Sequence, residues 1–493
     1  MSREQPFPQI ALDGVVFQYL KNTGIPRLWR SLLHTWAEQG FSEHLLVIDR
    51  DNTAPRLPGL RYCPMPTYDY GCTGSDAEQL QHICDVEGID LFISTYYTTP
   101  ISTPSVFMAY DMIPEVTGTD LQQSIWREKH YAILHALQYI CISQSTARDL
   151  VQFFPYISEA KIAIAPCGID PIFAPANHSD IAVFRATYGL NQPYFLIVGE
   201  RLGVDGYKNV PFFFRVLAQW AGRAHITVVC VGGRPNLEPE LVSLADDVPV
   251  QCLNLSDEDL RVAYSGAIAL VYPSRYEGFG LPIAEAMACG CPVITSPISS
   301  IPEVGGNAVL YVELDSVAEL VNALSVVQQP DVRQALIEKG LNQAKRFTWK
   351  RSAEIVAHTL RQTAETLHES TSVSLHESTS VSLDQPASET VNQPTDTEPK
   401  KLVPPPSVHA AFWNYFRTLQ REYQPLQVTL TRTERQLVKA ERQLKRSQIQ
   451  VQQTQQQLEA AKSQIQSMES SKFWRIRNAF VGLKQKLKPN STP

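Results

Sequence analysis

Two glutamates, Glu277 and Glu285, flank a glycine-containing turn with seven residues between them. An apolar strand precedes the turn, and Pro282 is well placed as the first residue of a following helix. Such a turn directs the free amides of Gly280 and Leu281 at the space above the helix start, where the positive helix end favours a phosphate. Both carboxylates can reach a ligand in that space, and carboxylates accept paired hydrogen bonds from neighbouring sugar hydroxyls.

A second interpretation of Glu285 stays open on spacing alone. The residue stands three positions after Pro282, where a glutamate can cap a helix start while the glycines only form a tight turn.

Two cations follow the predicted strand Tyr194–Val198. Arg201 and Lys208 lie in a glycine-rich turn before a helix, where an arginine fork and a lysine point charge can neutralise a diphosphate leaving group. Ordinary surface cations would explain the same two residues.

The stretch from Pro273 to Ile294 resembles the E-x7-E signature of retaining glycosyltransferase family 4, and its flanking P-S, G-F-G-L-P and E-A-M-A-x-G-x-P-V segments match as well. The resemblance implies a GT-B fold in which Glu277 contacts the transferred sugar and Glu285 binds the ribose of the donor. It implies that the turn of Phe279, Gly280 and Leu281 also contacts the donor, and that Arg201 and Lys208 grip the donor diphosphate.

The resemblance extends to the first half of the chain. Gly24, in the segment Asn22 to Arg27, resembles the family's N-terminal glycine turn, which approaches the donor phosphate. Tyr110 and Asp111 stand in place of a His-Asp-x-x-Pro motif, which adds Asp111 to the implied catalytic set and Tyr110 to the donor contacts. Tyr110 replaces the family histidine, and a tyrosine cannot act as an acid or base near neutral pH without a large shift from a pKa of about 10.

Two short motifs must be weighed as alternative metal sites. Asp49 and Asp51 form a D-x-D motif, with which single-domain GT-A transferases hold a divalent metal. Cys289 and Cys291 form a C-x-C pair that lacks a second pair at zinc spacing. Because the phosphate and sugar groups are already placed in the second half, we expect neither a metal nor another cofactor.

The elements that position these residues follow from the alternation of short β-branched runs with longer amphipathic runs from about residue 8 to residue 360, which is typical of βαβ chains. We predict an α/β protein with two Rossmann-like, doubly wound parallel-sheet domains at 1–175 and 176–366 and a ligand cleft between them. The candidate strands are His44–Ile48, Asp90–Ser94, Val106–Tyr110, Tyr139–Ile142 and Ile162–Pro166 in the first sheet, and Tyr194–Val198, Ile226–Val231, Ala267–Tyr272 and Pro292–Thr295 in the second.

The composition changes near Leu367, where the sequence HESTSVSL occurs twice in succession. We predict a disordered linker at 367–406, because it carries too little apolar surface to offset the entropy of ordering. Residues 430–465 keep one heptad position apolar, which predicts a helical segment with coiled-coil self-association at 407–470. A solvated glutamine-rich helix is the alternative. The repeated apolar position is held by Leu430, Leu437, Leu444, Val451, Leu458 and Ile465.

The last segment, 471–493, places Phe473, Ile476 and Phe480 on one helical face. Residues 472–488 also carry several lysines and arginines with no acidic residue among them. We expect this basic amphipathic helix to bind an anionic membrane surface. A docking helix for a protein partner and a solvated tail are the alternatives.

Composition restricts the remaining functions. A net charge of −7 argues against a nucleic-acid partner. There is no apolar run long enough to span a bilayer, no secretory signal, and an odd number of scattered cysteines that we interpret as reduced. We therefore expect a cytoplasmic protein, attached at most peripherally to the cytoplasmic face of the plasma membrane.

Together these features favour a hexosyltransferase that uses a GDP- or UDP-sugar, with mannose as the first expectation, and a saccharide or lipid-linked saccharide acceptor. Because Tyr110 replaces a histidine, a non-catalytic GT-B scaffold that organises other polysaccharide enzymes through its coiled coil is the alternative from another class. An enzyme of the same fold that epimerises or phosphorolyses sugars is a further rival.

Overall fold

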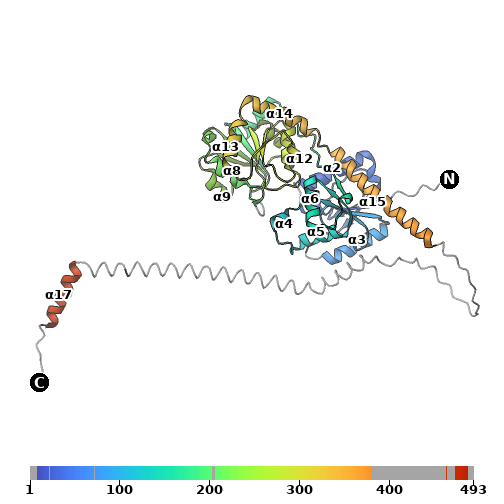
Figure 1. The fold of residues 1–493 in the computed structure, drawn as a ribbon, viewed down its shortest axis with the longest axis horizontal. Coiled ribbons are helices and arrows are strands. Elements are labelled where there is room, and N and C mark those ends of the chain that lie inside the picture. The colour runs from blue at the N-terminus through green and yellow to red at the C-terminus, as the bar shows by residue number, and fades with distance from the viewer. Residues whose placement is uncertain are drawn as a thin grey trace, which may run out of the picture. The chain divides into compact units, whose positions relative to one another are not determined.

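The computed structural model describes residues 8–20, 23–70, 73–202, 206–378, 462 and 472–486. The chain divides into two units, residues 1–410 and 411–493, which are described separately. The first unit carries two sheets with helices around them (Figure 1).

Both sheets are parallel throughout their described strands. The first has the order β3-β2-β1-β4-β5-β6-β7 and the second the order β10-β9-β8-β11-β12-β13. The strands of the first sheet are β1 (Ile10–Asp13), β2 (Leu45–Arg50), β3 (Arg61–Met65), β4 (Leu91–Ser94), β5 (Ser105–Ala109), β6 (Ala136–Cys141) and β7 (Ile162–Ile164), and those of the second are β8 (Tyr194–Val198), β9 (Thr227–Val231), β10 (Val250–Leu253), β11 (Ala269–Tyr272), β12 (Val293–Thr295) and β13 (Leu310–Tyr311).

Helices connect these strands on both faces of each sheet, as a doubly wound fold requires. In the first half they are α1 (Val15–Tyr19), α2 (Gly24–Gln39), α3 (Thr73–Glu87), α4 (Ile113–Thr117), α5 (Ser124–His135) and α6 (Gln144–Phe153). In the second half they are α7 (His178–Thr187), α8 (Val210–Leu217), α9 (Pro239–Ala245), α10 (Asp257–Gly266), α11 (Leu281–Ala288), α12 (Ile301–Gly305), α13 (Val317–Val326), α14 (Pro330–Ala344) and α15 (Trp349–Ser378).

The strand order reverses direction between β1 and β4 in the first sheet and between β8 and β11 in the second. Loops at the carboxyl ends of such neighbouring strands diverge to opposite faces and leave a crevice, which is where α/β sheets bind ligands. The turn with Lys208 follows β8 and the turn with Glu277 follows β11, so the reversal brings together two sequence-distant segments.

The predicted fold class is confirmed for the two sheet domains. All nine candidate strands overlap an observed strand, and Tyr194–Val198 has the predicted bounds. Buried parallel strands have continuous apolar sequences, and this pattern allowed them to be predicted. The observed strands β1, β3, β10 and β13 were not among the candidates.

The last helix of the first unit departs from the predicted division of the chain. α15 follows α14 of the second half but lies along α2 and the first sheet (Figure 1). Its carbonyl at Ala353 accepts a hydrogen bond of 3.0 Å from the Trp36 indole, and Val356 and Leu360 are fully buried. The predicted second domain, 176–366, therefore returns to the first sheet before it ends.

The same helix also changes the predicted start of the linker. α15 continues to Ser378, past Leu367, although the HESTSVSL sequence offered no apolar face. Extending an existing helix costs far less than starting one, so a long packed helix can continue into a segment that would not form a helix alone. Residues 379–406 of the predicted linker lie outside the described residues.

The second unit is described only in part. Apart from Lys462, the segment 407–470 and its predicted coiled coil lie outside the described residues. α17 (Lys472–Lys486) is a helix, as the tail pattern predicted, and it exposes Ile476, Phe480 and Val481 to solvent. None of the helices in the described ranges is both long enough and apolar enough to cross a membrane.

The packing of α15 on the first half can be tested at Leu360. Replacing this fully buried leucine with alanine should lower the free energy of unfolding by about 2–5 kcal/mol, because it removes buried methyl groups and leaves a cavity. Urea unfolding followed by circular dichroism measures the change. Glu354→Ala on the exposed face of the same helix is the control and should change it by about 0.5 kcal/mol or less. Equal effects of both variants would contradict the packing of this helix.

Candidate functional site

Glu277 lies in the turn between β11 and α11, and its own backbone is held rigidly. The Glu277 amide donates to the Ser299 hydroxyl over 2.8 Å. The Ser300 hydroxyl bridges the turn, because it lies 2.8 Å from the Glu277 carbonyl and 3.0 Å from the Phe279 carbonyl. These bonds hold the Glu277 backbone at the carboxyl edge of the second sheet.

Lys208, in the turn that follows β8, meets Glu277, in the turn that follows β11. Its ammonium group donates to the Glu277 carboxylate over 2.7 Å and to the Tyr272 hydroxyl over 2.6 Å. The two side chains are 15% and 9% exposed, so the pair is only slightly hydrated. A charged pair in such surroundings interacts more strongly than on the surface, and its cation is preorganised beside the place where an anion would enter.

The start of α11 has the geometry that the turn predicted. Gly280 precedes the helix with φ of 98° and ψ of 49°, a left-handed conformation that favours glycine, and a proline occupies the first turn. A methyl group on Gly24 would lie 3.2 Å from the Leu281 side chain, so the first residues of α2 and α11 are in contact. The positive ends of two helices therefore meet at one place, which favours an anion there.

Glu285, one turn into α11, binds groups from both halves. Its carboxylate accepts a 2.5 Å hydrogen bond from Arg27 of α2 and a 3.1 Å bond from the Tyr264 hydroxyl. Arg27 also lies 2.5 Å from the Asp257 carboxylate. Burial raises the pKa of the Glu285 carboxyl, while the Arg27 guanidinium opposes that shift. The alternative role as a simple helix cap is not observed, because both oxygens bind side chains outside the helix.

The two halves touch directly beside Glu277. A methyl group on Gly278 would lie 1.9 Å from the Tyr110 carbonyl oxygen, so this contact is possible only for a glycine. Next to it, the Tyr276 hydroxyl donates to the Asp149 carboxylate of the first half over 2.6 Å. The glycine after the first signature glutamate is thus a contact point between the domains.

A second interdomain contact uses a helix start. The Glu303 carboxylate of α12 accepts the free amides of Gln144 and Ser145 at the start of α6, over 2.8 and 2.7 Å. An anion is stabilised there by the helix dipole.

Asp111 lies at this junction, and the catalytic role that the resemblance implies for it stays a prediction. Its carboxylate accepts the Ile113 amide over 3.0 Å, and its carbonyl accepts the buried Lys129 ammonium over 3.1 Å. Burial raises the pKa of the Asp111 carboxyl, Lys129 opposes the shift, and the charge of Glu277 adds to it. Asp111 also lies beside the turn of Glu277, because a methyl group on Gly278 would lie 3.0 Å from the Asp111 Cβ.

The structure corrects the prediction for the Tyr110 side chain. Its hydroxyl donates to the Thr95 carbonyl over 2.7 Å and accepts the Trp29 indole N–H over 2.6 Å. Tyr110 is 3% exposed, so the hydroxyl is part of the first-half core and is not presented to a donor sugar. Only its backbone reaches the site.

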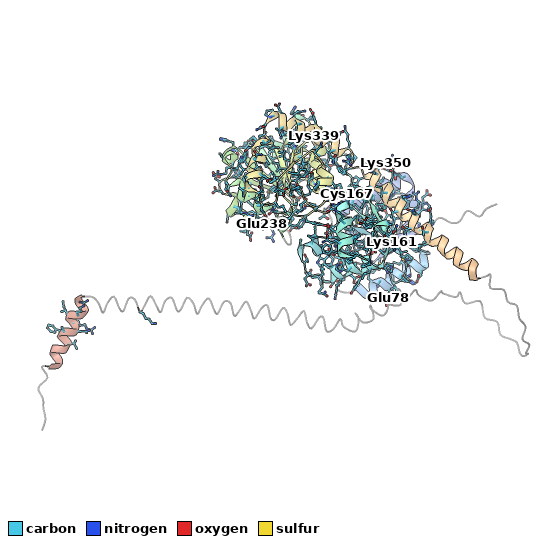
Figure 2. The ribbon with its side chains drawn as sticks, viewed as in Figure 1. Glu78, Lys161, Cys167, Glu238, Lys339 and Lys350 are labelled. Atoms are coloured by element: carbon cyan, nitrogen blue, oxygen red, sulfur yellow. The ribbon has the colours of Figure 1, made fainter. Side chains whose placement is uncertain are left out.

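Arg201 requires a second correction, because the structure does not bring it to the other site residues. The guanidinium is fully buried and bonded to the Glu238 carboxylate over 2.7 Å, on the second half where Figure 2 labels Glu238. Its remaining donors bind carbonyls of the loop between β9 and α9, at Gly232, Arg234 and Asn236. Arg201 shares none of these partners with Lys208, and its donors are used to hold this loop.

Two cations of the site, Arg27 and Lys129, were not assigned a role from the sequence. Arg27 was visible in the glycine segment, but its partners are more than 200 residues away in the chain. Lys129 lies in α5 and pairs with Glu115 over 2.7 Å. No local pattern distinguishes either residue from a surface cation.

The D-x-D residues do not face this site. Asp49 is buried, accepts the Ala54 amide over 2.9 Å and pairs with Arg56. Asp51 has a left-handed backbone at a turn. Among the described residues no group of three or more histidines, cysteines or acidic residues is arranged to hold a metal, which leaves the expectation about metal a prediction.

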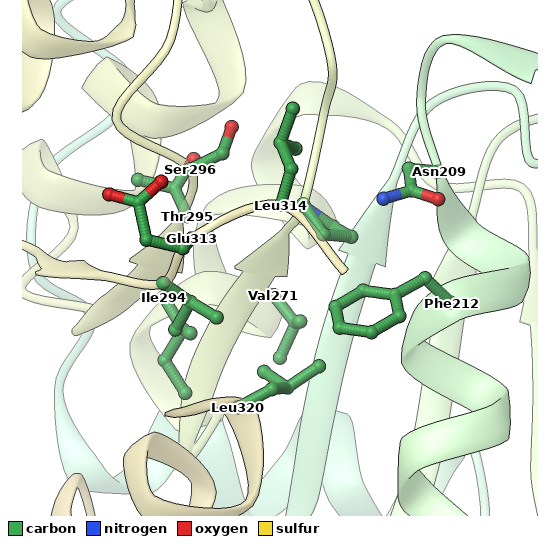
Figure 3. A pocket seen from close by; sticks show the side chains of 11 residues that line it. Asn209, Phe212, Val271, Ile294, Thr295, Ser296, Glu313, Leu314 and Leu320 are labelled. Atoms are coloured by element: carbon green, nitrogen blue, oxygen red, sulfur yellow. The ribbon is translucent and has the colours of Figure 1, made fainter. Parts of the chain in front are cut away.

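A small cavity of about 10 Å³ lies in the second half (Figure 3). Asn209, Phe212 and Leu320 are among its lining residues, and the Asn209 amide nitrogen is buried without a partner in the described structure. This volume is about that of one water molecule, so the cavity is not a site for a sugar nucleotide.

Gly278 offers a test of the interdomain contact. Gly278→Ala should push the Tyr110 carbonyl away, separate the halves beside Glu277, and lower the melting temperature, because overpacking of this kind costs about 1–3 kcal/mol. Thermal unfolding measures the effect. Gly340→Ala is the matched control, since a methyl group there would make ordinary contacts of 3.4 Å. An unchanged melting temperature for Gly278→Ala would show that this contact is not tight in solution.

Known proteins that are similar to this chain are glycosyltransferases by name. Residues 192–329 match the family described as "Glycosyl transferases group 1". The O-antigen chain mannosyltransferase B of Escherichia coli is 46% identical over 246 residues, which cover 48% of this chain and 64% of that protein, less than two thirds of its length. The O-antigen chain mannosyltransferase RfbU of Salmonella typhimurium is 26% identical over 280 residues, with 55% and 74% covered.

Solved structures give the same fold. The lipopolysaccharide glycosyltransferase WaaG superposes with a TM-score of 0.56 at 18% identity, covering 71% of this chain and 99% of WaaG. HepE of Anabaena, solved with UDP and glucose, superposes with a TM-score of 0.56 at 17% identity, covering 72% of this chain and 99% of HepE. The chain therefore has the GT-B fold, and its residues 192–329 are similar to the glycosyl transferases group 1 family, which agrees with the resemblance drawn from the sequence.

Proposed function

We propose that this protein is a retaining, metal-independent glycosyltransferase that moves a hexose from a nucleoside diphosphate sugar to a hydroxyl group of a saccharide. The observation that carries the proposal is the convergence of Glu277, Lys208, Glu285 and the start of α11 at the edge of the second sheet, next to Asp111 of the first. The rival non-catalytic scaffold is not favoured, since these groups are brought together and the relatives are named as transferases.

In this proposal the charge on the leaving diphosphate is stabilised by Lys208 and by the amides of Gly280 and Leu281. Such preorganised donors supply several kcal/mol in other enzymes. Glu277 orients the transferred sugar and Glu285 the ribose. The acceptor oxygen bonds to the anomeric carbon on the face from which the phosphate oxygen departs, and its proton passes to that phosphate oxygen. No enzyme nucleophile is needed, and configuration is retained.

We propose mannose from a GDP donor as the first substrate to test, because the relatives at 46% and 26% identity are both named mannosyltransferases. A UDP-sugar is the alternative, since HepE was solved with UDP and glucose. The acceptor proposed is a saccharide or lipid-linked saccharide in polysaccharide synthesis, as the O-antigen names of the relatives suggest. Self-association through 407–470 lies outside the described residues and stays a prediction.

The assignment is tested by Lys208→Ala and Glu277→Ala. Each should reduce transfer by about 100-fold or more, because each removes a group aimed at charge or hydroxyls of the donor. The measurement is nucleoside diphosphate release from GDP-mannose or UDP-glucose with saccharide acceptors. Lys339→Ala, an exposed lysine on α14, is the control and should leave the rate unchanged. Near-normal transfer by both site variants would refute the mechanism.

We also propose that α17 attaches the protein to the cytoplasmic face of a membrane. The exposed Ile476 and Phe480 stand four residues apart on one side of the helix, and Arg475 and Arg477 are exposed beside them. Apolar burial and attraction to anionic lipids act together on such helices.

Phe480→Asp should weaken binding of the full-length protein to vesicles that contain phosphatidylglycerol. The variant places a charge where the proposal puts apolar area into the bilayer. Asn478→Asp, which adds the same charge on the opposite side of the helix, is the control and should bind more strongly than Phe480→Asp. Vesicle sedimentation measures both. Equal binding by the two variants would exclude an apolar face of α17 that enters the bilayer. The helix would then bind membranes by charge alone or dock on a protein.

A further inference from the structure

Arg27 joins the two halves at the point where the helix starts meet. It lies in the first turn of α2 and its guanidinium is 2.5 Å from both the Glu285 and the Asp257 carboxylates of the second half. The group also stacks 5.4 Å from the centre of the Phe173 ring. The Arg27 side chain is 26% exposed, so it is held by these partners without being enclosed.

The positive charge available to a diphosphate is smaller than the sequence predicted, because Arg201 is buried in the loop between β9 and α9. Among the described residues, the cations that bind the two signature glutamates are Lys208 and Arg27. They approach from opposite halves, and the contact between Gly24 and Leu281 places the helix start of Arg27 against the start of α11.

Ribose hydroxyls that donate to Glu285 would compete with the present partners of its carboxylate. One of its oxygens binds Arg27 and the other binds the Tyr264 hydroxyl. Tyr264 is fully buried and packs against Phe173. Arg27 is the partner that can leave, because it is partly exposed and its second partner, Asp257, is also half exposed to water.

We propose that Arg27 is a donor-binding residue that exchanges partners: when the ribose of the sugar nucleotide takes its place on Glu285, its guanidinium turns to the diphosphate. This inference rests on the proposed function. A guanidinium suits the task, because its fork can bind two phosphate oxygens at once and it stays charged at any working pH. Arg27 would supply the second cation that Arg201 does not.

The exchange also balances the charges of the site. A diphosphate brings negative charge next to Glu277, Glu285 and Asp257, which repel it at short range. A cation that only neutralised Glu285 would leave this repulsion in place. A guanidinium that moves to the phosphate remains in the crevice, so it acts on the diphosphate and still faces the carboxylates. The cation comes from the first half, so donor binding would link the two domains.

The proposal predicts opposite effects on two ligands, measured by isothermal titration calorimetry on the full chain with guanosine and GDP, and with uridine and UDP. Arg27→Ala should bind the nucleoside as well as wild type or better, because Glu285 no longer has a competing partner. The ratio of diphosphate affinity to nucleoside affinity should fall at least tenfold from wild type to this variant, a difference of about 1.4 kcal/mol in binding free energy. Arg27→Lys, which keeps the charge without the fork, should recover part of this ratio.

Arg148→Ala is the matched control, because Arg148 also faces a carboxylate across the halves, 3.8 Å from Glu303, away from the start of α11. It should leave the ratio of diphosphate to nucleoside affinity unchanged. If Arg27→Ala and Arg27→Lys lost nucleoside and diphosphate affinity to the same extent, Arg27 would have a structural role and the proposal would be overturned. Unchanged affinity for both ligands would overturn it as well. Wild-type protein that binds neither diphosphate would instead overturn the proposed function, and this inference with it.

Discussion

The pairing of each buried signature glutamate with a cation is the interaction on which the arrangement of this protein depends. Glu277 pairs with Lys208 from the neighbouring loop, and Glu285 pairs with Arg27 from the other half. A buried carboxylate without such a partner would be costly, and it would become protonated instead. The two pairs therefore require the turns after β8 and β11 and the start of α2 to lie close together. Because α2 belongs to the first half, the second sheet alone could not supply both cations.

The fold meets this requirement with contacts on both sides of the crevice. Gly278 allows the backbone of the second half to touch that of the first, and Glu303 holds the start of α6. On the far side, the chain crosses between the halves twice, and the crossings touch: a methyl group on Gly168 would lie 2.1 Å from the Trp349 amide nitrogen. From there α15 runs along α2, the helix that carries Arg27. The position of Arg27 thus depends on packing far from the site.

Sequence patterns predicted the two sheets and the turn of α11, because buried strands and a Gly-x-Pro helix start are determined by neighbouring residues. Partner choice was less predictable. Arg201 has the type and sequence position expected of a diphosphate ligand, yet carbonyls of a loop 31 to 35 residues later hold its guanidinium. Tyr110 replaces a histidine in the motif, but Trp29 and Thr95 draw its hydroxyl into the core. Such choices depend on contacts that only the folded chain defines.

The paired charges also determine how a ligand can enter. Before a donor arrives, the carboxylates and cations at the start of α11 satisfy one another, so the site is nearly balanced in charge and its hydrogen bonds are used. A sugar nucleotide offers hydroxyls to the carboxylates and phosphate oxygens to the cations, and can replace both sets of bonds without leaving a charge unpaired. A nucleoside or a phosphate alone replaces only one set. An arrangement of this kind favours a ligand that carries both groups, because a partial ligand leaves one half of a broken pair in a poorly hydrated crevice.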